Sequence, residues 1–374
     1  MINMSKKQLF AFNIADLTEA MSKKDCFSPM LFANRELSDE VLIELEALGI
    51  VFLDMSLLLQ NEWESQHPYE KTRLATNELA PPAKVLCLFP WKRTLVRILE
   101  EDAFVNLRTL RNLYKHTTVE RELFRSKKIG IIGLSVGQSV ALPVALERIA
   151  GTIRLADFDK LELTNMNRIL GSILDIGNTK VLNTSRMIAE IDPYLNVEVF
   201  PDGVNQENIE EFLVGNGKLD LVIEECDSGE IKLLTRILCR KHRIPVIMET
   251  SDRGLLDIER FDLEPERPLL HGMLHEGQNK AGLTSEEKRQ LLMNSIDFSK
   301  VSERGLSSMH EVGKSIKSWP QLATDVISGG ATAALAARLI FSGIVLKSGR
   351  VYVDIQSRIL EELGSNDVDS QRAH

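Results

Sequence analysis

The chain has 374 residues, which is enough for one large domain with an appendage or for two domains. Hydrophobic residues make up 44% and charged residues 26%, as is ordinary for a soluble globular protein. The formal net charge of -9 argues against nucleic acid or an anionic membrane surface as the partner. No apolar run approaches the roughly 18 residues of a membrane span, and the N-terminus lacks the apolar core of a signal peptide. We therefore expect a cytoplasmic protein.

The four cysteines, Cys26, Cys87, Cys226 and Cys239, include no C-x-x-C pair. A zinc site built on cysteine pairs is therefore not expected, and a reducing compartment disfavours disulfides. We interpret each cysteine as a small buried apolar residue.

The N-terminal region, up to about residue 100, gives few signals. Apolar residues at helical spacing predict a helix over residues 36–48, with Ser38 as a possible N-cap. Short apolar runs predict strands at 50–55 and 84–90, whereas the polar, proline-containing stretch 60–82 indicates a loop. We expect this region to be a smaller α+β unit, followed by helical structure over residues 104–124.

From residue 127 on, strand and helix patterns alternate four times over about 120 residues. This alternation predicts an α/β fold: a Rossmann-like, mainly parallel sheet with helices on both faces. Ligands bind at the carboxyl ends of such strands. The predicted strands are 127–133, 152–159, 196–200, 219–225 and 244–250, and the predicted helices are 139–150, 180–191, 208–214 and 231–242.

The C-terminal part begins with a polar, irregular segment at 274–318, which contains a charged helix near 285–293. A segment of this length inside a compact domain is usually functional or mobile. We then expect an Ala-rich helix at 325–345, a last strand at 349–355 and a frayed tail at 365–374.

A candidate phosphate loop, Gly133-Leu134-Ser135-Val136-Gly137-Gln138, lies between the first strand and the first helix. Glycines there let the backbone approach phosphates, and the helix N-terminus offers free N–H groups. The match to G-x-G-x-x-G is imperfect, because Ser135 replaces the second glycine and Gln138 stands at the third. An ordinary tight turn is the alternative.

Asp157 favours the nucleotide interpretation. It ends the second strand, 24 residues after Gly133, where an acid normally holds ribose hydroxyls. The loop and this acid together predict a nucleotide site, but they do not choose between NAD and ATP.

The residues that follow Asp157 favour ATP. Asp159, Asn165 and Arg168 come within twelve residues of it, and Lys180 follows after a further twelve. A triphosphate that releases pyrophosphate needs cations near the departing oxygens, and Arg168 and Lys180 suit that role. The alternative is that both are solvated surface charges.

A cluster of acids ends the fourth strand, at Glu224-Glu225-Cys226-Asp227. Magnesium takes one or two carboxylates plus phosphate oxygens, so Asp227 is the candidate metal ligand. The alternative for all three acids is a solvated acidic strand end.

These motifs resemble those of the ThiF/MoeB and ubiquitin-activating enzyme superfamily. The resemblance covers roughly residues 108–273, with weaker agreement to about 355, and the stretch from Asp157 to Arg168 is its most specific part. Upstream, Arg108-x-x-Arg111-Asn112 resembles the R-x-x-R-Q element of that superfamily. The Ala-rich helix near Gly330 falls where these proteins have a glycine-containing helix that closes the site.

The resemblance implies an ATP-dependent adenylyltransferase. Asp157 would hold the ribose, Arg168 and Lys180 would neutralise phosphates, and Asp227 would organise magnesium. Gly133, Ser135, Val136 and Gly137 would form the phosphate loop, with Asp159 and Asn165 also contacting the nucleotide. The substrate carboxylate attacks the α-phosphate, and no general base is needed because a carboxylate is already ionised near pH 7.

The resemblance also implies a homodimer. Arg111, more than Arg108, would reach the ATP site of the other subunit and stabilise the pentavalent phosphate. No cysteine lies in the crossover segment after Met273, where ubiquitin-activating members carry their thioester nucleophile. Because Cys226 and Cys239 are poor candidates, we expect no transfer to a thiol of the chain.

Two further features stay open. Residues 249–254 follow the fifth strand and contact either the acyl substrate or only the protein itself. His271, as a lone histidine, is more often structural than catalytic.

The N-terminal region favours a peptide or small protein as the substrate, as in microcin-type and pantocin-type antibiotic pathways. Such enzymes often carry an N-terminal peptide-binding domain. We expect an accessory, peptide-binding region over 1–100 and an adenylation domain over 101–374, with a crossover segment at about 274–318. Activation of the C-terminus of a ubiquitin-like sulfur carrier is the first alternative. An NAD-dependent oxidoreductase and a non-catalytic dimeric scaffold are the others, but both leave the cations and acids after Asp157 unexplained.

Overall fold

The computed structural model describes residues 9–23, 26–76, 79–280 and 282–364. The described residues form two compact units. The first contains those up to Ser126, together with Ala145–Ile153 and Leu182–Val199; the second contains Lys127–Val144, Arg154–Val181 and those from Phe200 on. The predicted frayed tail at 365–374 lies outside the described residues.

The N-terminal part of the chain alternates short helices with four strands. Its α2 helix begins after Ser38, whose side chain accepts a hydrogen bond from the Val41 N–H, so the predicted N-cap is confirmed. The elements are α1 (Ile14–Ser22), β1 (Met30–Ala33), α2 (Asp39–Ala47), β2 (Val51–Asp54), α3 (Ser56–Gln66), α4 (Pro68–Ala75), β3 (Lys84–Phe89), β4 (Thr94–Leu99), α5 (Glu101–Arg108) and α6 (Thr118–Ser126).

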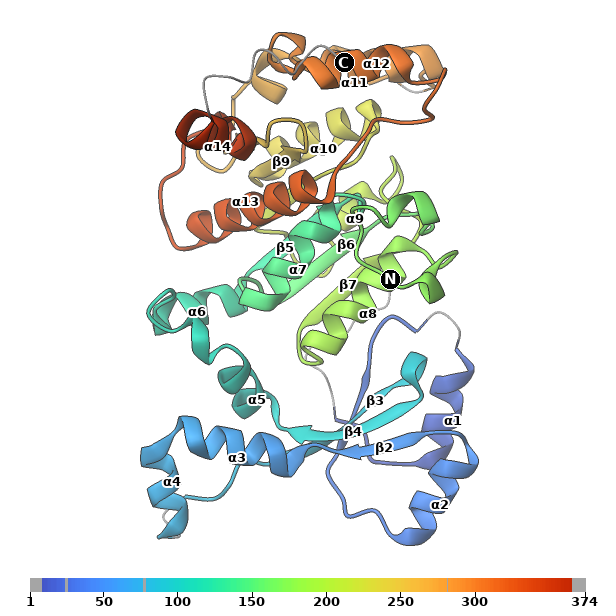
Figure 1. Cartoon of the computed structure of the whole chain (residues 1–374), viewed down its shortest axis with the longest axis vertical. Helices are drawn as coiled ribbons and strands as arrows, with labels where there is room; N and C mark the ends of the chain where they lie inside the picture. The colour runs from blue at the N-terminus through green and yellow to red at the C-terminus, as the bar shows by residue number, and fades with distance from the viewer. Residues whose placement is uncertain (1–8, 24–25, 77–78, 281, 365–374) are drawn as a thin grey trace. The chain divides into compact units, whose positions relative to one another are not determined.

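These four strands form a mixed sheet in the order β1-β3-β4-β2 (Figure 1). The pairs β1–β3 and β3–β4 are antiparallel, and β2 pairs with β4 in parallel. Side chains alternate along β3, so that Leu86 and Leu88 lie in one apolar cluster while Val85 and Cys87 lie in another. Both faces of the sheet are therefore buried, which explains the continuous apolar run of β3.

From Lys127 on, the chain builds a seven-stranded sheet and its helices. The elements are β5 (Lys128–Ile132), α7 (Gly137–Glu147), β6 (Thr152–Ala156), α8 (Lys180–Ile191), β7 (Asn196–Phe200), α9 (Ile209–Val214), β8 (Leu221–Glu224), α10 (Gly229–His242), β9 (Val246–Thr250), β10 (Leu255–Glu259), α11 (Ser285–Asn294), α12 (Glu303–Glu311), α13 (Ala323–Phe341), β11 (Gly349–Tyr352) and α14 (Ile355–Leu363).

The strand order, β11-β10-β9-β8-β5-β6-β7, places the first strand of this fold in the interior of the sheet. The chain proceeds outward from β5 to β7 and then returns to add β8 on the other side of β5. β5–β8 and β8–β9 are parallel pairs, and the antiparallel strands β10 and β11 complete the sheet. The predicted Rossmann-like, mainly parallel sheet is confirmed, and its topological switch point lies between β5 and β8.

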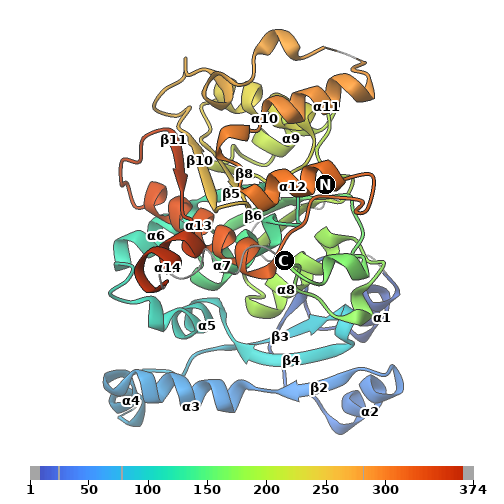
Figure 2. The same ribbon diagram turned by 45° about the horizontal axis from the view of Figure 1, so that its top comes forward.

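Helices cover this sheet on both faces. Side chains of α9 and α10 form one apolar cluster with Val222, Val246 and Met248, and α11 lies beside α10 (Figure 2). α13 lies against β9 and β10 and meets α7, where the Ser139 hydroxyl donates to the Val326 carbonyl at 2.8 Å.

Among the described residues, α13 alone is long and apolar enough to cross a membrane, by length and composition only. The sequence led us to expect no such segment. Its buried side is made of small residues, including Gly329, Gly330 and Ala333, which let the helix approach the sheet closely. Its apolar composition is thus explained by its place in the core of the second unit.

Two predicted segments are corrected, and one strand was not predicted. The expected loop at 60–82 contains most of α3 and all of α4, because Pro68 occupies the first turn of a helix, where its missing N–H costs nothing. The expected helix at 104–124 is interrupted between Arg108 and Thr118. The sequence patterns also missed β10, which returns antiparallel to β9 after a tight turn.

The contact between α13 and α7 gives a stability prediction. A Cβ on Gly330 would lie 2.2 Å from Ser139 Oγ and 2.4 Å from its carbonyl oxygen. In a free helix, Gly→Ala gains about 1 kcal/mol. Here we expect Gly330→Ala to lose about 1–3 kcal/mol of unfolding free energy through overpacking. Urea denaturation measures this, with the exposed neighbour Ala331→Ser as a control that stays near wild type. A gain for Gly330→Ala would contradict the described packing.

Candidate active site

The two strands at the switch point approach each other closely at Gly133. Its φ is +85°, and a Cβ there would lie 2.8 Å from the Glu225 carbonyl oxygen, so only glycine fits. The Gly133 N–H donates to the Ala156 carbonyl at 2.9 Å. The loop after β5 thus lies at the ends of both β6 and β8, where the predicted ribose and magnesium acids stand.

Arg168 reaches the candidate phosphate loop. One of its terminal nitrogens lies 3.3 Å from Ser135 Oγ, and the other donates to Asn167 Oδ1 at 2.9 Å and to the Thr164 carbonyl at 3.3 Å. Its buried Nε has no hydrogen-bond partner among the described residues. The structure therefore places a guanidinium with spare donor capacity beside the loop, as the sequence predicted.

Gln138 was left in doubt by the sequence because it replaces the last glycine of the motif. Its side chain is buried and bonds both backbone groups of Leu170, donating to the carbonyl at 3.0 Å and accepting from the N–H at 2.7 Å. Gln138 thus fastens the segment that carries Arg168 to the first turn of α7. A loop match alone could not indicate this role.

Asp157, Asp159 and Lys180 form a connected chain of polar groups. The buried Asp157 carboxylate accepts from the N–H of Leu134 at 2.6 Å and from that of Asp159 at 2.7 Å. Burial raises the pKa of Asp157, although these hydrogen bonds and the Lys180 charge oppose the rise. Lys180 Nζ donates to Asp159 Oδ2 at 2.8 Å. This arrangement fixes the predicted ribose acid against the loop.

Asp227 is exposed and faces the same space as Arg168. Together with Ser135 and Val136, these residues line a pocket of about 250 Å³. Burial lowers the pKa of Arg168, and the negative charge of Asp227 opposes that shift. Asp227 accepts no hydrogen bond from the described residues, so its carboxylate is available to a ligand. The far walls come from residues of the predicted crossover segment and its flanks, including Leu292, Lys300 and Trp319.

Among the predicted site residues, Ser135, Val136, Arg168 and Asp227 line this pocket, whereas Arg111, Gly133, Gly137, Asp157, Asp159, Asn165 and Lys180 do not. Asn165 Oδ1 accepts from the Glu162 N–H at 3.0 Å and caps a short turn, and Asn165 does not line the pocket. Arg111 belongs to the first unit, where it is exposed and makes no hydrogen bond or ion pair with a described residue. Arg108, by contrast, is tied to the buried Asp192 at 2.8 Å, which explains why it is the less available arginine.

Of the acids at the end of β8, Glu224 and Glu225 are buried, contrary to a solvated strand end, whereas Asp227 is exposed. Neighbouring residues of a strand point to opposite faces. Glu224 meets α10, where Lys232 and Arg236 pair with it and lower its pKa to about 2 despite the burial. Glu225 points the other way and accepts the Glu249 N–H at 2.9 Å. Burial and the Glu249 charge raise its pKa well above the ordinary value.

Glu249, at the end of β9, lines the pocket and is only 3% exposed. Neither of its carboxylate oxygens has a hydrogen-bond partner among the described residues. Burial raises its pKa to about 8, and the charge of Asp325 adds to the shift. The sequence placed residues 249–254 at the ligand edge but gave no sign of this unpaired carboxyl.

The remaining candidates fit structural roles. His271 lies 2.9 Å from Asp257 and 2.7 Å from an Arg267 nitrogen, within a set of paired charges. Cys239 is fully buried, and burial raises the pKa of both Cys226 and Cys239, which opposes thiolate formation.

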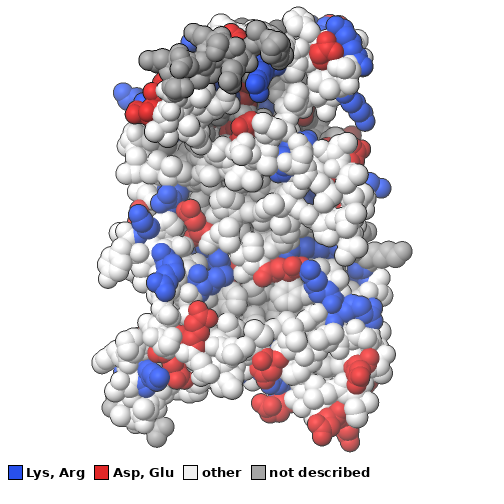
Figure 3. Space-filling model, in the orientation of Figure 1, with Lys and Arg blue, Asp and Glu red and all other residues white. Residues whose placement is uncertain are grey.

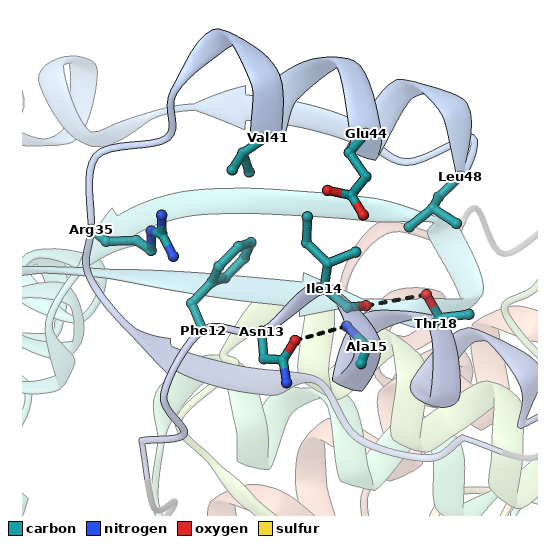
Figure 4. Close-up of a pocket in the computed structure, with 9 residues that line it drawn as sticks. All are labelled: Phe12, Asn13, Ile14, Ala15, Thr18, Arg35, Val41, Glu44 and Leu48. Carbon is teal, nitrogen blue, oxygen red and sulfur yellow. Dashed lines mark hydrogen bonds between the residues drawn. The ribbon is translucent and has the colours of Figure 1, made fainter.

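The first unit contains a separate pocket of about 540 Å³ (Figure 4). Its walls combine apolar and polar side chains, with one acid and one base, and Arg35 lies over the Phe12 ring at 5.5 Å. The lining residues are Phe12, Asn13, Ile14, Ala15, Thr18, Arg35, Val41, Glu44 and Leu48.

Charges on the surface are mixed in sign. On the face drawn in Figure 3, Lys and Arg are interspersed with Asp and Glu. Within the described ranges, no three His, Cys, Asp or Glu side chains are grouped so that they could hold a metal ion. A divalent metal at Asp227 would therefore need oxygens from a ligand.

Sequence comparison identifies the domain that carries this site. The ThiF family matches residues 109–280. This part of the chain is therefore similar to the ThiF family. The match contains the phosphate loop, Arg168, Lys180 and Asp227, so the resemblance seen in the sequence is confirmed.

This chain matches parts of two longer sequence relatives and most of one solved structure. Uncharacterized protein MT1398 of Mycobacterium tuberculosis is 43% identical over 284 residues, which are 75% of this chain and 39% of that protein. The molybdopterin-synthase adenylyltransferase of Haemophilus influenzae is 24% identical over 149 residues, 40% of this chain and 60% of that protein. A solved structure of E. coli tRNA N6-threonylcarbamoyladenosine dehydratase in complex with ATP is 19% identical, with a TM-score of 0.47 over 65% of this chain and 96% of that chain. The chain thus spans less than two thirds of either sequence relative.

Glu249 and Glu224 give a pair of opposite predictions for the pH dependence of stability. The unfolded-state pKa of glutamate is about 4.3, so between pH 4.5 and 8 folded Glu249 keeps a proton that the unfolded chain releases, and stability falls as pH rises. Glu249→Gln removes this loss, so we expect it to exceed wild type by about 2–4 kcal/mol at pH 8 and to match it near pH 4.5. Glu224→Gln should instead lose about 3 kcal/mol near neutral pH, because it leaves the buried Lys232 without a carboxylate partner and Arg236 with Glu259 alone.

Chemical denaturation of both variants from pH 4.5 to 9 tests this pair. Equal destabilisation by both substitutions would show that Glu249 is as well paired as Glu224.

Proposed function

We propose that the chain uses ATP and magnesium to adenylate a carboxylate of a peptide or small protein, releasing pyrophosphate. One observation carries this proposal: Arg168 contacts the phosphate loop at Ser135 and lines a single pocket with Asp227 at the switch point of the sheet. A cation and a free carboxylate beside a phosphate loop suit a triphosphate with its metal. The name of the adenylyltransferase relative supports the same chemistry.

The residues fit a magnesium ion that arrives with the nucleotide. Asp227 has an unpaired carboxylate, and magnesium keeps near-octahedral coordination with few protein ligands and several phosphate or water oxygens. When bound there, the ion would neutralise phosphate charge. Asp227 would hold it, and Arg168 would donate hydrogen bonds to the phosphate oxygens from the other side of the pocket.

In the proposed reaction, an oxygen of the substrate carboxylate bonds to the α-phosphorus of ATP, and the bond to the bridging oxygen of pyrophosphate breaks. Arg168 donates to oxygens that gain charge in this step, which lowers the barrier. The N–H groups of Leu134 and Asp159 hold Asp157 in the orientation that accepts ribose hydroxyls, and Lys180 in turn bonds Asp159. No proton leaves the attacking group, so the step needs no base.

An NAD-dependent oxidoreductase is a weaker proposal. It would use Gly133 and Asp157, but it gives no role to Arg168 and the free Asp227 carboxylate, which line one pocket. A scaffold without catalysis gives no role to these two residues either.

We propose that the substrate whose carboxylate is adenylated is a peptide, and that the reaction belongs to the maturation of a peptide antibiotic. The pocket of the first unit supports this, because its apolar walls with Arg35 and Glu44 offer one anchor for an apolar side chain and two for charges. Activation of the C-terminus of a ubiquitin-like sulfur carrier is the alternative, and exchange assays with each substrate class separate the two. We place the reaction in the cytoplasm.

Nucleotide choice is the first test. We expect calorimetry with magnesium to detect ATP binding and no NAD binding. Arg168→Ala should lower the affinity for ATP by about tenfold or more, since it removes charge-assisted hydrogen bonds that contribute about 1.5–3 kcal/mol. Asp227→Ala should abolish the magnesium dependence. Arg358→Ala, an exposed arginine of α14, serves as the control with unchanged affinity. NAD binding, or ATP binding that ignores Arg168, would refute the proposal.

The proposed homodimer gives a second test, because Arg111 is exposed and unpaired and would complete the partner's site. Arg111→Ala and Asp227→Ala should each be inactive alone in ATP–pyrophosphate exchange. When both are mixed after exchange of subunits, about half the dimers are mixed, and each holds one intact site, so about a quarter of wild-type activity returns. A mixture that stays inactive would show that Arg111 acts within its own chain, and full activity of Arg111→Ala alone would show that it takes no part in the reaction.

A further inference from the structure

The Glu249 carboxyl is buried without a hydrogen-bond partner among the described residues, which is unfavourable in free energy. A buried carboxyl with no hydrogen bond costs several kcal/mol unless it stays protonated or a ligand satisfies it. Both of its oxygens lack partners among the described residues, yet the side chain lines the pocket that holds Arg168 and Asp227. An unpaired acid aimed into a ligand pocket indicates a group that the ligand completes.

α13 leaves space for this carboxyl at Gly329. A Cβ on Gly329 would lie 1.9 Å from Glu249 Oε1 and 2.0 Å from its carboxyl carbon. Glycine costs about 1 kcal/mol in a helix relative to alanine. The helix therefore gives up intrinsic stability at the one turn where the carboxyl needs the space.

The charges around Glu249 favour a cation as its partner. Glu225 of β8 lies beside it, and Asp325 of α13 adds negative charge, while Lys232 and Arg236 of α10 are engaged by Glu224. The other charged or titratable groups that line the pocket are Arg168, Cys226, Asp227, Asp252, Asp297, Lys300 and Tyr352. Asp252 already accepts from Ser302, and no cation among the described residues forms an ion pair with Glu249.

We propose that Glu249 binds the ammonium group of a second substrate, an amine, and acts as the base that prepares it to attack the acyl-adenylate. This inference rests on the adenylation proposed above and adds to it the class of acceptor and the residue that receives its proton. The product would be an amide.

The ammonium loses one proton to the Glu249 carboxylate and becomes a nucleophilic amine. Its nitrogen bonds to the acyl carbon, the bond from that carbon to the AMP oxygen breaks, and AMP leaves with the electron pair. The nitrogen releases its second proton to water. A base with a pKa near 8 accepts a proton from an ammonium far better than an ordinary carboxylate near 4.3.

Binding of n-propylammonium to the full chain tests the cation site without a known substrate. Wild type should bind it with an affinity that rises about tenfold per pH unit from pH 6 to 8 and then levels off, because protonated Glu249 must lose its proton first. Glu249→Gln should bind at least about tenfold more weakly at pH 9 and show no such slope, whereas Glu249→Asp should keep part of it. Glu303→Gln, an exposed acid of α12, is the matched control.

Magnesium–ATP is titrated into the same proteins. If wild type binds ATP and the Gln variant binds propylammonium as wild type does, the inference is overturned while adenylation stands. If wild type binds no ATP but shows the Glu249-dependent amine site, adenylation falls and a cation site remains. With a substrate found by pyrophosphate exchange, Glu249→Gln should keep the exchange and lose propylamide formation; loss of both together would overturn the proposed division of the two steps.

Discussion

The site depends on the close approach of β5 and β8. Gly133 lies so near the Glu225 carbonyl that no side chain fits there, and the loop after β5 is thereby held at the end of β8. Because the strand order reverses at this point, the loop, Asp157 and Asp227 come from separate segments yet meet at one edge of the sheet. The sheet topology thus gathers these residues at one place, and Gln138 keeps the segment that carries Arg168 attached to the first turn of α7.

The alternation of side chains along β8 separates two kinds of buried acid. Glu224 meets two cations of α10 and stays ionised, so it stabilises the fold. One residue later, Glu225 points to the side where Glu249 lies and where α13 supplies glycine instead of a cation. The same end of the sheet therefore carries a satisfied charge network around Glu224 and an acid, Glu249, that lines the pocket and has no hydrogen-bond partner for its carboxylate among the described residues.

Much of the second unit could be predicted from its sequence, because buried parallel strands read as apolar runs and their helices as periodic ones. The loop, Asp157, Arg168 and Asp227 were found because their spacing follows the strand ends. The sequence did not show that the side chain of Asn165 caps a short turn, because the spacing of residues does not reveal local capping. The unpaired state of Glu249 depends on Gly329, eighty residues away, and no local pattern could show it. The boundary near residue 100 and the role of Arg111 stay predictions.

The most direct measurement follows the oxygen of the substrate carboxylate. Peptides and small proteins whose carboxyl groups carry ¹⁸O are incubated with the chain, ATP and magnesium, and the nucleotide products are weighed by mass spectrometry. If the carboxylate attacks the α-phosphate, breakdown of the acyl-adenylate by an amine leaves one ¹⁸O in AMP, and pyrophosphate is the other product. ADP with phosphate as the products, or AMP without the label, would contradict adenylation at this site.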